Sequence, residues 1–302
     1  MNDWQRWLQA PQTLWLRRAL FQVHLWLGIG FGLYLLVISV SGSAVVLRPQ
    51  FSQWFTPSRV PSTAGEALRG QALEAKVAEV YSDAQVTTVA VSTIPGRAVY
   101  VAMTREGREY TRFFDPYTGT DLGETFPWPV RTMEWLVKLH DDLLLDRTGR
   151  QINGLGGMLL LLMLMTGLVL WWPGRAHWRN SLVIRRRSAR SLFWQLHTVL
   201  GLWSLLLLLV WGLSAIYFAF PAPFEFIIDS FDADLYDAER PDGWLLLLLD
   251  LHFGRFGGLW GRLTWVVLGL LPAFMFITGF VLWWRRVVTG RLKEKWLRSS
   301  AP

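Results

Sequence analysis

Four of the five histidines occupy repeated positions in the chain, and their chemistry suits the binding of a metal. His24 recurs as His197, and each lies in a Gln-x-His-x-x-x-Gly sequence. His140 recurs as His252, and each follows a leucine. A neutral imidazole offers one unprotonated ring nitrogen to a metal ion. Two such side chains can therefore fill the two axial positions of one iron porphyrin.

Membrane helices must position these histidines. The chain of 302 residues is 52% apolar, with 19 Trp and 18 Phe, which lies outside the usual soluble range. A hydrocarbon core about 30 Å thick requires roughly 20 helical residues. Four stretches are long and apolar enough, at about 19–47, 151–173, 193–219 and 259–284. The predicted fold class is an all-α membrane protein with four transmembrane helices.

The four helices form two copies of one helix pair. Besides the histidines, the run Thr166-Gly167-Leu168-Val169-Leu170-Trp171-Trp172 recurs as Thr278-Gly279-Phe280-Val281-Leu282-Trp283-Trp284. Each copy has a helix with a histidine near its start, a Leu-His segment, and a returning helix that ends in Trp-Trp. The Trp pairs fit the aromatic belt of a membrane interface. We therefore expect a four-helix transmembrane bundle built from a duplicated helix pair.

The distribution of arginine predicts the orientation, because cytoplasmic loops retain positive charge. Arginines gather before the first helix, in the loop 173–192 and after Trp284, whereas the loop 219–262 holds eight acids and three arginines. Both termini and the middle loop are therefore predicted to be cytoplasmic. This topology accounts for the net charge of +7. It favours inner-membrane lipid as a partner, and no nucleic acid is expected.

A small folded insertion interrupts the first helix pair at 48–135. Residues 65–81 have the pattern of an amphipathic helix. Residues 86–91, 98–104 and 110–115 have the pattern of strands separated by Pro-Gly and Glu-Gly turns. The insertion is predicted to be an α+β module outside the cytoplasm. The expected division of the chain is 1–47 (cytoplasmic N-terminus and first helix), 48–135 (insertion), 136–173 (interfacial segment and second helix), 174–192 (Arg-rich cytoplasmic loop), 193–219 (third helix), 220–258 (periplasmic loop and interfacial segment) and 259–302 (fourth helix and cytoplasmic tail).

The repeated histidines fall at two depths. His24 follows Arg18 by six residues and His197 follows Arg190 by seven, which puts both roughly 10 Å into the membrane from the cytoplasmic side. His140 and His252 lie in short apolar segments expected along the outer interface. Two b-type haems, one for each pair, would divide the insulating layer into shorter electron-transfer steps. The alternatives are ligation by only two histidines, or a structural or proton-relay role.

The absence of cysteine and two repeated arginines bear on the kind of redox cofactor that the chain could hold. The chain has no cysteine, which excludes c-type haem attachment and cysteine-ligated iron-sulfur clusters. Arg150 and Arg262, repeated before the returning helices, could pair with haem propionates on the outer side. Snorkelling at the interface is the alternative for both.

These motifs, in this order, resemble the PepSY-associated transmembrane family over nearly the whole chain. The insertion, with its Phe-Asp-Pro-x-Thr-Gly turn, is similar to a PepSY module. Within the family, the resemblance points to the FoxB-type ferric-siderophore reductases of the bacterial inner membrane. It implies His24, His197, His140 and His252 as axial ligands of two haems b. It also implies a ferric siderophore or other iron complex as the electron acceptor.

Three functions remain open on the sequence. The favoured one is a di-haem membrane reductase that takes electrons from a quinol or a separate cytoplasmic reductase. No Gly-x-Gly-x-x-Gly motif follows a strand, so the chain is not expected to bind NAD(P)H itself. The second is a transporter of an iron complex without redox chemistry, against which stands the expectation that no helix is broken. The third is a binding or regulatory protein that acts through its insertion.

Overall fold

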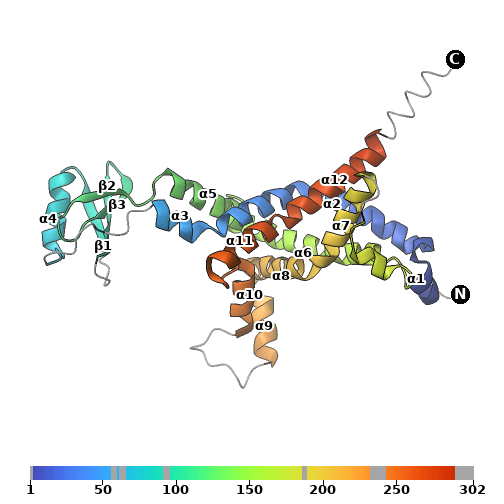
Figure 1. Cartoon of the computed structure of the whole chain (residues 1–302). Helices are drawn as coiled ribbons and strands as arrows, with labels where there is room; N and C mark the ends of the chain where they lie inside the picture. Colours follow the sequence, from blue (N-terminus) through green and yellow to red (C-terminus); the bar gives the residue numbers. More distant parts are fainter. Residues whose placement is uncertain are drawn as a thin grey trace, which may run out of the picture. The chain divides into compact units, whose positions relative to one another are not determined.

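Long helices dominate the fold, as the long apolar runs predict. The computed structural model describes residues 3–55, 60, 66–90, 96–185, 189–231 and 243–289. Parts of the predicted loops 174–192 and 220–258, and the tail beyond residue 289, lie outside the described residues. The elements are α1 (Asp3–Gln9), η1 (Pro11–Thr13), α2 (Trp15–Val45), α3 (Arg48–Phe55), α4 (Gln71–Val80), β1 (Gln85–Ala90), β2 (Val99–Arg105), β3 (Arg108–Phe114), β4 (Asp121–Glu124), α5 (Trp128–Asp142), α6 (Asp146–Trp171), η2 (Trp178–Leu182), α7 (Ala189–Trp203), α8 (Leu205–Ala219), α9 (Ala222–Phe231), α10 (Gly243–Phe253), α11 (Gly258–Gly269), α12 (Leu271–Trp284) and η3 (Arg285–Thr289) (Figure 1).

Three helical runs in the described part of the chain could each cross a bilayer. They are α2, α6 and the run Gly258–Thr289, with mean hydropathies of 2.0, 2.1 and 2.2. A fourth span would consist of α7 and α8 together, which meet at Ser204 with a bend of 63°. The expectation that no helix is broken is therefore wrong. Glycine and serine in the same turn are a frequent cause of such kinks, and Ser204 Oγ lies 3.4 Å from the carbonyl oxygen of Gly201.

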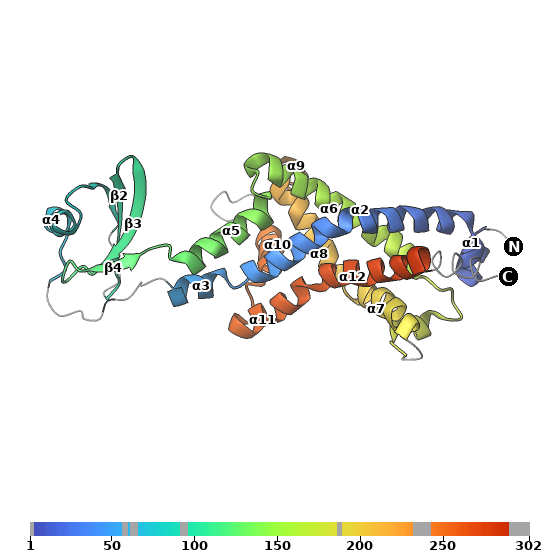
Figure 2. The same ribbon diagram turned by 90° about the horizontal axis from the view of Figure 1, so that it is seen from above.

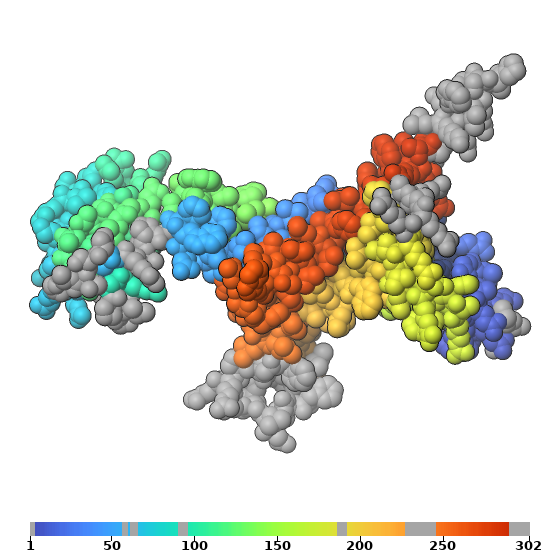
Figure 3. Space-filling view, in the orientation of Figure 1, coloured from blue at the N-terminus to red at the C-terminus, as the bar shows by residue number. Residues whose placement is uncertain are grey.

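The chain forms two compact units, and the larger comprises Met1–Val46 and Val137–Pro302. Within it, α2 packs against α6 and α12, α6 packs against α8, and α7 packs against α12 (Figure 2). The red residues of α12 lie beside the yellow residues of α7 in the space-filling view (Figure 3). Helices α6 and α8 meet at glycines: a Cβ atom on Gly157 would lie 2.7 Å from the carbonyl oxygen of Gly212.

Large apolar side chains cover the outward faces of these helices. Leu33, Met165, Leu206 and Val267 each expose between 63% and 72% of their surface. An exposed apolar surface over this length of helix matches a lipid environment and would be unfavourable in water.

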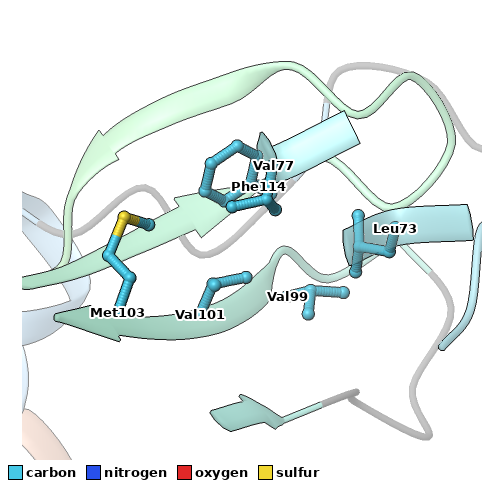
Figure 4. Close-up of a cluster of buried hydrophobic side chains, with 6 residues drawn as sticks. All are labelled: Leu73, Val77, Val99, Val101, Met103 and Phe114. Carbon is cyan, nitrogen blue, oxygen red and sulfur yellow. The ribbon is translucent and has the colours of Figure 1, made fainter. Parts of the chain in front are cut away.

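The smaller unit, Leu47–Leu136, contains the α+β module. Its four strands pair in the order β1-β2-β3-β4, each antiparallel to the next. The core is formed by Leu73 and Val77 of α4 against Val99, Val101 and Met103 of β2 and Phe114 of β3 (Figure 4). Alternate residues of β2 face this core, because side chains along a strand point to opposite faces.

The structure modifies the predicted elements of the module in two places. The expected helix at 65–81 begins only at Gln71, after Gly70, whose φ of +52° is outside the helical range. The fourth strand, β4, was not predicted, because Asp-Leu-Gly-Glu lacks the β-branched and aromatic residues typical of strands. Backbone pairing with β3 defines it, with Phe113 opposite Gly123.

A polar cluster joins α4 to the sheet. The Tyr81 hydroxyl donates to Asp121 Oδ2 (2.5 Å), and Arg112 Nε donates to the same oxygen (2.7 Å). Burial, together with this carboxylate, raises the pKa of Tyr81 to about 12. The pKa of Asp121 is lowered: burial opposes the charge, and hydrogen bonds from Tyr81, Gly123 and Arg112 outweigh that opposition. The ionised carboxylate of Asp121 thus links Tyr81, which follows α4, to Arg112 of β3.

Candidate functional site

The structure brings the four repeated histidines together in two pairs. His24 of α2 and His197 of α7 have ring centroids 6.3 Å apart, with ring planes at 81°. His140 of α5 and His252 of α10 also have ring centroids 6.3 Å apart, with ring planes at 52°. Each pair takes one histidine from each copy of the duplicated unit. We call them the 24/197 pair and the 140/252 pair.

In the 24/197 pair, each ring nitrogen Nδ1 is hydrogen-bonded to a threonine. His24 Nδ1 lies 2.9 Å from Thr166 Oγ1, and His197 Nδ1 lies 3.0 Å from Thr278 Oγ1. Both threonine hydroxyls donate to carbonyl groups of their own helix. Since a hydroxyl has one hydrogen, each threonine oxygen accepts the Nδ1 proton. The Nε2 atoms of His24 and His197 are left unprotonated, as metal ligands must be.

The 140/252 pair reaches the same state with different acceptors. His140 Nδ1 lies 2.9 Å from the carbonyl oxygen of Ile38, and a carbonyl can only accept. His252 Nδ1 lies 2.5 Å from Ser214 Oγ, whose own hydrogen bonds to the carbonyl of Trp211. Both rings therefore carry their proton on Nδ1, which leaves Nε2 free for a metal.

The spacing of each pair fits two imidazoles bound to one metal ion. With nitrogen–metal bonds of about 2 Å and nitrogen roughly 1 Å from its ring centroid, two trans imidazoles have centroids about 6 Å apart. Among the described residues, no group of three or more His, Cys, Asp or Glu side chains could hold a metal. Each pair thus supplies two protein ligands only. A porphyrin, which brings four equatorial nitrogens of its own, suits such a two-ligand arrangement.

A cavity of about 1140 Å³ adjoins the 24/197 pair. Helices α2, α6, α7, α8 and α12 line it, mostly with Leu, Phe, Met and Trp side chains. Gly167 and Gly279 admit the two imidazoles: a Cβ atom on either would lie 3.2 Å from the Cε1 atom of His24 or His197. The cavity is at the large end of ordinary ligand pockets, so it is adequate for a large, flat, apolar ligand.

The backbone around the 140/252 pair is fixed at equivalent positions of the two copies. Asn153 Nδ2 donates to the carbonyl of His140 (2.8 Å) and to that of the next residue (2.7 Å). The Tyr34 hydroxyl donates to Asn153 Oδ1 (2.9 Å). In the second copy, Trp265 occupies the position that corresponds to Asn153, and its Nε1 donates to the carbonyl of Leu251 (2.9 Å). A side-chain donor thus holds each histidine-bearing segment.

The two predicted arginines differ in their surroundings. Arg150 is exposed and forms an ion pair with Asp141, with Nη2 2.7 Å from Oδ2. A protein carboxylate therefore already occupies its guanidinium. Arg262 lies half-buried on α11. His177, the unrepeated histidine, is exposed ahead of η2 and belongs to neither pair.

The groups that accept the Nδ1 protons had no predicted role. Thr166 and Thr278 were visible as the first residues of the repeated Thr-Gly-x-x-Leu-Trp-Trp run, and Ser214 as the repeat of Ser41. Their recurrence at a constant distance from the repeated histidines in both copies was the available signal. The carbonyl of Ile38 gave no signal, because a backbone acceptor is independent of residue type.

Comparison with known proteins identifies a family whose match extends over both copies of the duplicated helix pair. No curated protein matches it. The PepSY-associated TM region family matches residues 21–243 and 232–286, which cover most of the chain and all four paired histidines. The chain is therefore a membrane protein that belongs to the PepSY-associated TM region family.

Proposed function

We propose that this protein is a di-haem b-type oxidoreductase that carries electrons across the bacterial inner membrane. In this proposal the 24/197 pair holds one haem near the cytoplasmic side and the 140/252 pair holds a second near the periplasmic side. One observation carries the proposal: both pairs join histidines from different copies of the duplication at the centroid spacing that one iron between two imidazoles requires.

Each bound iron would supply one-electron redox chemistry by alternating between the ferric and ferrous states. The protein's part is to hold its ligands in the reactive tautomer. Thr166, Thr278, Ile38 and Ser214 accept the Nδ1 protons, so the Nε2 lone pairs are left free for the iron. Hydrogen bonds of this kind orient a metal-bound histidine and raise its basicity. The walls of the cavity beside the 24/197 pair are mostly apolar.

The acceptor we propose is Fe(III) held by a siderophore on the periplasmic side, which one electron reduces to weakly held Fe(II). The donor would be a quinol or a separate cytoplasmic reductase. The family resemblance suggests the substrate of this haem-dependent reductase activity. The two histidine pairs support its cofactor.

A reduced-minus-oxidised optical spectrum of the purified protein tests the cofactor. We expect the α and β bands of b-type haem at two haems per chain, and a pyridine haemochrome assay measures that ratio. Protein that stays colourless after expression with excess haem precursor, and after reconstitution with hemin, would refute the proposal.

Proteoliposomes test the direction of electron flow. Vesicles loaded with a reduced donor should reduce an external ferric siderophore, and a chromogenic Fe(II) chelator outside records the product. Vesicles containing the His252→Ala variant provide the control, because the second haem would lack one axial ligand. Equal Fe(II) production by both preparations would exclude the proposed route.

The bend at Ser204 favours one other candidate, a transporter of an iron complex, because broken helices line substrate paths in many transporters. Here the backbone hydrogen bonds continue through the bend. Ser204 N donates to Leu200 O (2.8 Å), and Leu208 N donates to Ser204 O (2.9 Å). Both carbonyls thus accept helical hydrogen bonds, unlike the unwound carbonyls that bind ions in transporters. Uptake of labelled siderophore by vesicles made with haem-free protein would favour transport.

A further inference from the structure

All charged side chains that line the cavity beside the 24/197 pair are positive. They are Arg17, Arg18, Arg285 and Arg286, and no acidic residue belongs to the described lining. An apolar cavity with charge of one sign at one end is suited to an amphiphilic ligand of the opposite charge.

Arg17 is occupied by the protein itself. Its guanidinium donates to the carbonyl oxygens of Trp172 (2.7 Å), Val169 (3.2 Å) and Leu170 (2.5 Å). These are carbonyls at the end of α6, which helical hydrogen bonding leaves unpaired. Arg17 thus caps α6 and is unavailable to a ligand.

The other three arginines are exposed at the same end of the cavity, and we call them the arginine collar. The guanidinium of Arg285 lies 5.1 Å from the ring of Phe193, and that of Arg286 lies 5.1 Å from the ring of Phe21. Among the residues that the structure describes, no carboxylate forms an ion pair with Arg18, Arg285 or Arg286. The collar is thus positive charge without a protein counter-ion in that part of the chain.

The collar lies less than two helical turns from the imidazoles along the chain. Arg18 precedes His24 by six residues, and Arg285 follows Gly279, which touches the His197 ring, by six. Six residues of helix correspond to about 9 Å. Two different helices therefore bring guanidinium groups to the same level, on the same side of the 24/197 pair.

We propose that the arginine collar binds the two propionate carboxylates of the porphyrin held by His24 and His197. This inference rests on the proposed function and adds to it an orientation: the propionate edge faces the start of α2 and the start of η3, where the collar lies. Guanidinium groups suit this task because they pair with carboxylates in a bidentate geometry. Arg150, already paired with Asp141, has no such freedom.

Porphyrin titrations test the collar. Haem-free protein carrying His252→Ala, which disables the 140/252 pair, is titrated with ferric protoporphyrin IX and with its dimethyl ester, which lacks the carboxylate charges. We expect the free acid to bind roughly tenfold tighter or more than the ester, as charge-assisted hydrogen bonds predict. With Arg18→Gln, Arg285→Gln and Arg286→Gln combined, the acid and the ester should bind alike. Arg179→Gln, outside the cavity, should leave the preference intact.

The ester also reports whether the triple variant is folded, because its low-spin spectrum requires both imidazoles. An undiminished preference for the acid in a triple variant that still binds the ester would overturn the collar. So would equal binding of the acid and the ester by protein with an intact collar in detergent free of anionic phospholipid, since the arginines would then serve another group, such as lipid phosphate. If the collar alone is wrong, both porphyrins still bind and His24→Ala abolishes their binding; if the proposed function is wrong, neither porphyrin binds even to protein with an intact 24/197 pair.

Discussion

The groups that accept the Nδ1 protons give the four histidines different chemical settings. Two threonines serve the 24/197 pair, whereas a backbone carbonyl and a serine serve the 140/252 pair. A stronger acceptor makes the imidazole more basic and stabilises the ferric state of a bound iron. The two proposed haems should therefore differ in midpoint potential.

Removing the threonine acceptors should change one potential only. In the double variant Thr166→Val and Thr278→Val, the imidazoles become less basic, so the midpoint potential of the haem at the 24/197 pair should rise. A redox titration of the optical bands measures both potentials. Thr264→Val is the matched control, because the Thr264 hydroxyl bonds to the carbonyl of Trp260 in its own helix. An unchanged potential would contradict the role given to these hydroxyls.

Asn153 should be more important than Tyr34 for the 140/252 pair. Asn153→Leu removes both bonds to the backbone at His140 and leaves the Tyr34 hydroxyl without its acceptor. Loss of a group that orients a metal-binding side chain typically weakens metal binding by about 10–100-fold. Tyr34→Phe removes one hydrogen bond, worth about 1 kcal/mol. Haem content after dialysis against apomyoglobin compares the two variants, and equal retention would show that Asn153 does not position His140.

At this scale the sequence indicated which histidines correspond and gave no indication of the groups that accept their Nδ1 protons. The duplication singled out four histidines, and the structure places those four in two pairs. Haem ligation by the four histidines, and the pairing of Arg150 and Arg262 with haem propionates, remain predictions. The ion pair of Arg150 with Asp141 depends on the turn between α5 and α6, which no repeat or period encodes.

Among the helices, the contact between α6 and α8 leaves least room for change. Gly157→Ala would place a methyl group 2.7 Å from the carbonyl oxygen of Gly212. Overpacking of this kind costs about 1–3 kcal/mol, which outweighs the roughly 1 kcal/mol that alanine gains over glycine in a helix. Gly30→Ala is the control, because its Cβ position has no atom within 4 Å apart from the neighbouring backbone of its own helix. Thermal unfolding in detergent should give a lower Tm for Gly157→Ala and an unchanged or higher Tm for Gly30→Ala; the reverse order would exclude close α6–α8 packing.

The insertion module should lose stability in acid because of Asp121. Its lowered pKa means that the stabilisation is complete above the ordinary value of 3.8 and is lost as pH falls through the folded-state pKa. The rate of pepsin cleavage of the full chain, measured at pH values from 3.8 downward, reports the acid stability of the module. With Asp121 intact, the module should become sensitive to pepsin only at the lowest pH values of this range. Asp121→Asn should be cleaved readily throughout the range. Parallel pH profiles for the two proteins would show that Asp121 contributes nothing.

The elements show where sequence patterns succeed and where they fail. Apolar length predicted α2 and α6 to within a few residues, since hydropathy reports directly on burial in lipid. The bend at Ser204 was missed because a leucine-rich run keeps the same hydropathy whether it is straight or bent. β4 was missed because its partner, β3, determines it, and a short strand has little pattern of its own.

The whole molecule is a duplication whose two copies share each proposed site. Because the 24/197 and 140/252 pairs are formed by different residues, each should lose its haem independently. His24→Ala should halve the haem content per chain and leave one midpoint potential unchanged, as measured by pyridine haemochrome and redox titration. His177→Ala, which changes the histidine outside both pairs, should keep two haems. A complete loss of haem in His24→Ala by folded protein would mean that the pairs do not act separately.

For the whole molecule, the sequence predicted which histidines of the two copies are equivalent. The structure shows which helices bring the equivalent histidines together. Correspondence follows from a constant spacing along the chain. Contact between His24 and His197 depends on α2 and α7 facing one cavity, which results from the packing of both helices against α12. No pairwise spacing contains that information.

The angles between the rings carry one more consequence. The planes of His24 and His197 are nearly perpendicular, at 81°, whereas those of His140 and His252 are at 52°. With crossed axial ligands, two d orbitals of a low-spin ferric ion become almost equal in energy, and the electron paramagnetic resonance signal becomes strongly anisotropic. A less crossed arrangement separates those orbitals and gives a narrower rhombic spectrum. If both pairs hold a haem as proposed, one frozen sample of oxidised protein should therefore display two magnetically distinct iron centres, one for each pair of imidazoles.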